Sequence, residues 1–105
     1  MEQRRTRRFT LELPLAIVRS GAERVKQAGH TKNISSGGVL FTSEAEPDVG
    51  EPIEYIITLS GPSEHRVNLR CIGKIVRYRK AAEANKTGFD VAATLERYEF
   101  MRVED

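Results

Sequence analysis

Apolar residues recur at every second position in four segments of this sequence, and that alternation restricts the fold more than any other feature. It runs through residues 11–19, 53–59, 67–79 and 89–95, and short stretches rich in glycine, proline, serine and asparagine separate these segments. Successive side chains of a β-strand point to opposite faces of a sheet, so a period of two predicts strands with one buried face. The intervening residues are typical of tight turns.

A short polar strand near residues 23–28 and another at "VLFT" bring the total to six or so strands, with no helices alternating between them. This pattern predicts an all-β fold, an antiparallel barrel or sandwich, and a barrel is favoured because closure removes exposed strand edges. Gly73 is expected to form a bulge or bend in the longest strand. The bulge would decide which of Arg70, Lys74 and Arg77 face outward.

The 105 residues are expected to form one domain. Residues 1–10 would be a flexible arginine-rich segment, 11–95 the barrel, and 96–105 a tail or short helix that caps the barrel's open end. Hydrophobic residues make up 39% of the chain, enough for a modest core. No apolar run approaches the ~20 residues that span a bilayer. No secretory signal follows the arginines, so a cytoplasmic location is expected.

The sequence offers no arrangement of residues suited to catalysis or metal binding. His30 and His65 lie far apart, no metal-ligand spacing occurs, and Ser35 has no nucleophile elbow around it. The carboxylates are scattered, so no pair is singled out for acid and base chemistry. The single cysteine, Cys71, lies between apolar residues and is predicted to be a core residue. We therefore expect a protein that is not an enzyme, without metal or cofactor.

Positive charge gathers at the start of the chain, although the net charge is only +2. Arg4, Arg5, Arg7 and Arg8 fall within five positions. Guanidinium groups stay charged, bind phosphate oxygens bidentately, stack on aromatic rings and match the O6/N7 edge of guanine. The cluster fits a phosphorylated, planar ligand, although alone it is equally typical of a solvated tail.

The stretch "NISSGG" presents a short amide and a hydroxyl two residues apart, at Asn33 and Ser35. In an extended or Asx-turn backbone both side chains point the same way. Gly37 and Gly38 are expected to let the main chain approach a ligand closely and to adopt positive φ. By itself, such a stretch is also typical of a tight turn whose polar side chains bond local backbone.

Together these motifs resemble those of the PilZ domain, a bacterial receptor module for the second messenger cyclic di-GMP. Arg4 and Arg8 match the family's RxxxR, and Asn33, Ser35 and Gly38 match its [D/N]xSxxG. The segments "LPLAIV", "GGVLF", "GKIVR" and "GFDVAATLERYEF" resemble the family's strand sequences in the usual order. The resemblance implies a six-stranded antiparallel barrel of PilZ type, with the arginine segment wrapping the nucleotide against its outer surface.

The resemblance also implies a role for each arginine of the first motif. It assigns Arg4 and Arg8 to the phosphates and guanine edges of cyclic di-GMP, with Arg5 assisting by stacking or charge. Arg7 stays undecided. We expect the ligand to order residues 1–10 and so to alter the surface seen by an unknown downstream protein.

The second motif would contribute hydrogen bonds from Asn33 and Ser35 to a guanine or its neighbouring backbone, while Gly38 keeps that wall low. The motif begins with asparagine where many members have aspartate, so it lacks a charge that would pair with the arginines.

Two other interpretations stay open: a small barrel that binds single-stranded nucleic acid, and a ligand-free PilZ-like adaptor for another protein. Low net charge, an aromatic content of 7% and the absence of tryptophan argue against the first, because such barrels stack bases on aromatic rings. The intact motifs argue against the second. Whether one or two ligands bind, and whether the chain is a monomer or homodimer, is left open.

Overall fold

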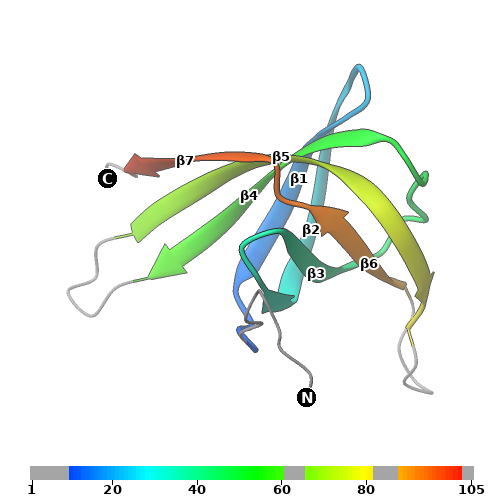
Figure 1. The fold of residues 1–105 in the computed structure, drawn as a ribbon, viewed down its shortest axis with the longest axis horizontal. Helices are drawn as coiled ribbons and strands as arrows, with labels where there is room; N and C mark the ends of the chain where they lie inside the picture. The colour runs from blue at the N-terminus through cyan, green and yellow to red at the C-terminus, as the bar shows by residue number, and fades with distance from the viewer. Residues whose placement is uncertain (1–9, 61–65, 82–87, 103–105) are drawn as a thin grey trace, which may run out of the picture.

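The structure is a computed structural model that describes residues 10–60, 66–81 and 88–102. In these ranges the chain forms antiparallel β-strands and no helix (Figure 1). Accordingly, the part described holds no helix long and apolar enough to cross a membrane. The strands are β1 (Pro14–Ser20), β2 (Glu23–Ile34), β3 (Gly38–Ser43), β4 (Pro52–Ser60), β5 (Arg66–Lys80), β6 (Phe89–Thr94) and β7 (Arg97–Arg102).

Six of the strands close into a barrel. The hydrogen-bonded order is β4-β1-β2-β3-β6-β5, and a further β4–β5 pairing completes the ring. All pairings are antiparallel. The predicted six-stranded antiparallel barrel is therefore confirmed.

The prediction of a short C-terminal helix is wrong, because residues 97–102 form β7, an extra strand on β5. The tail alternates charged and aromatic residues, so extended backbone puts Tyr98 and Phe100 on one face and Glu99 on the other. The first half of β5 offers an edge that the barrel does not use, and β7 occupies it. The expected capping is also wrong, since Tyr98 and Phe100 are 59% and 65% exposed.

The core fills the barrel with alternate residues from its strands. Phe41 and Tyr55 are fully buried and stack with ring centroids 6.0 Å apart. The Tyr55 hydroxyl donates to the Thr94 carbonyl at 3.0 Å, so the one polar atom of this ring has a partner. Cys71 is also fully buried, which confirms its place in the core, and burial raises the pKa of its thiol to about 12.

The bulge expected at Gly73 lies instead at Val76. Pairing of β5 with β4 continues without interruption through Gly73, whereas the β5–β6 register shifts between Ile75 and Arg77. Gly73 has another function, because a Cβ there would lie 1.8 Å from the Thr94 carbonyl oxygen. The glycine allows two backbone segments to meet where β5 leaves β4 and β7 and begins to pair with β6.

Two strand boundaries also differ from the sequence-based expectation. The first strand begins at Pro14 rather than at residue 11, with its proline as the first residue of the strand. The second strand runs from 23 to 34, well beyond the predicted end at 28. It pairs with β1 as far as His30 and with β3 from Thr31, so one long polar strand serves two neighbours.

Candidate ligand-binding face

A bulge in β2 turns two consecutive polar residues to the outside of the barrel. Thr31 pairs with Phe41 and is fully buried, and the register then shifts so that Asn33 pairs with Leu40. Lys32 is the extra residue, and both Lys32 and Asn33 are only half-buried. The asparagine of the predicted motif therefore lies on the outer side of the sheet.

The bulge at Val76 in β5 has a matching effect three strands away. Ile75 is buried, Val76 and Arg77 are both exposed, and Tyr78 returns to pack on the core. Arg77 pairs with Ala92, so its side chain shares the outer side with that alanine. The bulge at Val76, and not Gly73, therefore turns Arg77 outward, whereas Arg70 and Lys74 lie before it in the regular pairing with β4.

The two bulges complete a row of outward residues across four strands, formed by Asn33, Leu40, Ala92 and Arg77. We call the outer surface around this row the motif face. Neighbouring strands lie about 4.8 Å apart, so the row is about 14 Å long. A hollow of about 300 Å³ covers part of it, lined by the glycine turn, Leu40, Ala92 and Arg77. The Arg77 side chain has no hydrogen bond or ion pair with any residue the structure describes.

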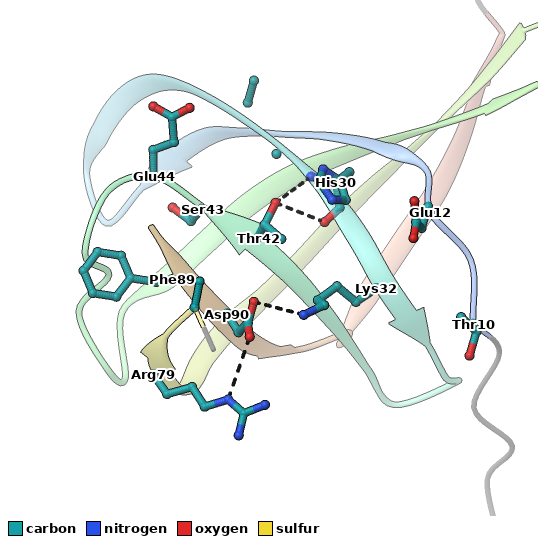
Figure 2. A pocket seen from close by; sticks show the side chains of 13 residues that line it. Thr10, Glu12, His30, Lys32, Thr42, Ser43, Glu44, Arg79, Phe89 and Asp90 are labelled. Atoms are coloured by element: carbon teal, nitrogen blue, oxygen red, sulfur yellow. Dashed lines mark hydrogen bonds and ion pairs between the residues drawn. The ribbon is translucent and has the colours of Figure 1, made fainter. Parts of the chain in front are cut away.

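A second row of the motif face carries a buried carboxylate held by two cations. Asp90, on β6, is only 4% exposed, and its oxygens lie 3.3 Å from Lys32 Nζ and 3.8 Å from Arg79 Nε (Figure 2). Thr10 and Glu12 join this cluster in lining a hollow of about 460 Å³. Lys32 and Arg79 thus compensate Asp90, whereas Arg77 keeps its charge available.

The turn between β2 and β3 joins two residues of the second motif, Ser35 and Gly38, by hydrogen bonds. The Ser35 N–H donates to the Gly38 carbonyl at 2.8 Å, and the Ser35 hydroxyl donates to the same oxygen at 3.3 Å. Ser35 is 8% exposed, as the local-turn interpretation expects. A Cβ on Gly38 would lie 3.0 Å from the Ala93 carbonyl oxygen, so the turn lies close to β6.

The expectation of positive φ at Gly37 and Gly38 is wrong. Among the described glycines, positive φ occurs at Gly21, Gly50 and Gly88. The connection of residues 35–37, closed by the Ser35–Gly38 hydrogen bond, reverses the chain without a glycine in the left-handed region.

Thr31 attaches the segment that follows the arginine motif to β2. The Leu13 N–H donates to Thr31 Oγ1 and the Thr31 N–H donates to the Leu13 carbonyl, each at 2.9 Å. The Thr31 hydroxyl also donates to the Leu11 carbonyl. Arg4, Arg5 and Arg8 themselves lie outside the described residues.

Sequence reasoning did not select Thr31, Lys32, Arg79 or Asp90. The signal for the first two is the lack of alternation within "HTKNI", where four polar residues follow one another before the next apolar one. Asp90 carries no such signal, since its cations come from two other strands, β2 and β5. In the ranges described, no three His, Cys, Asp or Glu side chains are grouped so as to hold a metal ion.

Comparison with known families identifies the family to which this chain belongs. The sequence matches the PilZ domain family over residues 2–100. The chain belongs to the PilZ family. PilZ domains are non-enzymatic receptors that typically bind cyclic di-GMP, in agreement with the expectation that this chain is not an enzyme.

The PilZ fold of the chain also resembles a solved structure, that of the Bacillus subtilis inhibitor of motility (MotI/DgrA). The TM-score is 0.68 at 17% sequence identity, and the match covers 94% of this chain. The chain spans 44% of the length of that protein chain. No curated protein matches this PilZ domain by sequence. At this identity the likeness supports the barrel fold and not a shared ligand.

Proposed function

We propose that this PilZ domain is a receptor for cyclic di-GMP, bound between the arginine motif and the motif face. One observation carries the proposal: Thr31 holds Leu11 and Leu13 against β2 two residues before Asn33. Leu11 follows Arg8 by three residues, so the Cα atoms of these two residues are at most about 10 Å apart. Segments distant in sequence therefore meet where the two motifs need to cooperate.

Arg4 and Arg8 are assigned to the phosphates and guanine edges of the ligand, with Arg5 contributing stacking or charge. Two phosphates and two guanines match guanidinium chemistry, because one fork binds phosphate oxygens or the O6/N7 edge. The charge that these residues bring is local, since the chain as a whole carries only +2.

Asn33 and Ser35 are assigned to hydrogen bonds with a guanine. An amide both donates and accepts, so Asn33 can match a base edge. The Ser35 hydroxyl donates its hydrogen bond to the Gly38 carbonyl, and its oxygen can still accept one from a guanine N–H. Gly38, without a side chain, leaves this end of the hollow low.

Arg77 is assigned to the opposite end of the same row. It is exposed, it lines the hollow above Leu40 and Ala92, and the described residues leave its charge uncompensated. Ala92, between Arg77 and Leu40, has a small side chain that leaves room above the sheet for a flat ligand. We assign Arg77 to a phosphate or base edge that extends beyond the two motifs.

Signalling would follow from the ordering of residues 1–10 on the ligand, which changes the surface that a downstream protein meets. The hydrogen bonds of Leu11 and Leu13 to Thr31 support this mechanism, because they give the segment a fixed point from which to close.

Isothermal titration calorimetry with cyclic di-GMP, GTP and a short single-stranded oligonucleotide tests the proposal. We expect saturable binding of cyclic di-GMP, and much weaker binding of GTP, which has one guanine and no second nucleotide. Tight binding of the oligonucleotide alone would replace the proposal with a nucleic-acid function. Absence of binding to all three would favour a protein-recruiting adaptor.

A further inference from the structure

We infer that Thr31 is a positioning residue for ligand binding, which fixes Leu11 and Leu13, on the segment that joins the arginine motif to β1, relative to the asparagine–serine–glycine motif through one buried hydroxyl. This inference rests on the proposed function. Thr31 belongs to neither motif and faces the inside of the barrel, so it would act through the segments it joins and not by touching the ligand.

The surroundings of Thr31 show what its hydroxyl is for. The residue is 0% exposed and lies opposite the fully buried Phe41, a position that suits an apolar side chain. A buried hydroxyl costs free energy unless it is hydrogen-bonded. Here the oxygen accepts from the Leu13 N–H and donates to the Leu11 carbonyl, so both capacities are used on the same incoming segment.

These bonds hold backbone that no strand holds. Leu11 and Leu13 precede β1, which begins at Pro14, and therefore lie outside the β1–β2 ladder. Three hydrogen bonds from Thr31, one of them from its main chain, take the place of that ladder. Without the hydroxyl, only the Thr31–Leu13 main-chain bond would remain.

Thr31 is also the last residue before the bulge that turns Lys32 and Asn33 outward. Its side chain fixes the position of Leu11 and Leu13, and its main chain precedes the bulge that places Asn33 on the outer side of the sheet. A single residue thus fixes Leu11 and Leu13, from which the arginine motif extends, relative to Asn33 before ligand is bound. Fixing a binding geometry in advance reduces the entropy lost on association, which raises affinity.

The test compares Thr31→Val with Thr31→Ser, using the whole chain and cyclic di-GMP in calorimetry. Thr31→Val keeps the shape and removes the hydroxyl, and we expect affinity to fall about tenfold. Thr31→Ser keeps the hydroxyl and should bind within about threefold of the unsubstituted chain. Thr58→Val is the matched control, because its hydroxyl bonds Asn68 Oδ1 at 3.1 Å between β4 and β5, away from the motif face. It should bind normally.

A double-mutant cycle with Arg8→Ala separates positioning from general weakening of the barrel. If Thr31 acts through the arginine segment, Thr31→Val costs little further affinity once Arg8 is gone, whereas a merely structural role gives additive losses. Hydrogen exchange of the Leu13 amide should be faster in Thr31→Val and unchanged in Thr58→Val. Thr31→Ala replaces Thr31→Val in the cycle should the valine variant fail to fold.

Two outcomes would overturn the inference. One is affinity unchanged in Thr31→Val although exchange at Leu13 has become faster, and the other is additivity in the cycle. Both leave the receptor function intact, because the unsubstituted chain still binds. Failure of the unsubstituted chain to bind cyclic di-GMP would instead remove the proposed function, and this inference with it.

Discussion

The motif face and the β7 extension are two outer regions of the same barrel, and they differ in whether their β5 arginine is paired with an acid. We use "β7 extension" for β7 together with the adjoining parts of β4 and β5, which reach to the left in Figure 1, away from β2, β3 and β6. There Arg70 bridges Glu54 and Glu99, the latter at 3.3 Å. On the motif face, Arg77 has no such acid among the described residues.

Large apolar side chains are exposed on the β7 extension and not on the row that defines the motif face. Tyr98 and Phe100 are more than half exposed and contact each other edge to face at 6.1 Å, whereas the motif face is floored by Leu40 and the small Ala92. On the β7 extension the exposed rings lie on one face of β7 and the ion pairs of Arg70 on the other. The aromatic face suits packing against apolar groups, and a hollow with spare positive charge suits a phosphorylated ligand. The comparison teaches that the two ends of one strand, β5, can carry surfaces of different chemistry.

The largest effect is expected at Gly73, where β5 passes from one region to the other. Gly73→Ala would drive a Cβ against the Thr94 carbonyl oxygen, which also accepts the Tyr55 hydroxyl. We expect a loss of about 3 kcal/mol or more in the free energy of unfolding, measured by urea denaturation. Gly37→Ala is the control, because nothing lies within 4 Å of its Cβ, and it should change stability by less than about 1 kcal/mol. Equal effects would show that the two regions do not depend on this close contact.

The next largest effect separates the regions by function. Arg8→Ala should weaken cyclic di-GMP binding about 100-fold, equivalent to about 2.7 kcal/mol, because it removes charge-assisted hydrogen bonds to the ligand. Arg70→Ala makes the same change of charge on the β7 extension, where it breaks ion pairs to Glu54 and Glu99. It should leave the calorimetric affinity unchanged and change the melting temperature only slightly, because ion pairs exposed to solvent contribute little to stability. Comparable losses of affinity in both variants would mean that net charge, and not the motif, drives binding.

A smaller effect is expected at Arg77, the uncompensated cation of the motif face. Arg77→Ala should raise the Kd for cyclic di-GMP about tenfold and leave the melting temperature nearly unchanged, since no described residue pairs with it. Arg97→Ala on the β7 extension, another exposed arginine, serves as the control and should bind normally. Wild-type affinity in Arg77→Ala would confine the site to the two sequence motifs.

Much of the barrel could be predicted from alternation, because each strand buries one face and the period of two is visible in the sequence. Both bulges escaped prediction or were misplaced, since one extra residue at Lys32 or Val76 leaves only a brief break in the pattern. β7 was mistaken for a helix because its partner edge on β5 exists only in the folded barrel.

The candidate site was foreseeable where it follows family motifs and not where it depends on long-range contacts. Asn33, Ser35 and Gly38 were selected from the sequence. The buried bonds of Thr31 and the cations around Asp90 join residues that are between 11 and 58 positions apart, and no local pattern in the sequence indicates such pairs.

The bulge at Val76 makes the number of residues in β5 as consequential as their chemistry. If β5 kept all its residues but lost the bulge, strict alternation would turn Arg77 inward and Tyr78 outward, and the later side chains of the strand would change sides with them. The number of residues in β5 therefore determines which side chains lie on the motif face. Inserting one residue beside Val76 would change the proposed ligand contacts more than many substitutions would, even though it removes none of the residues that make them.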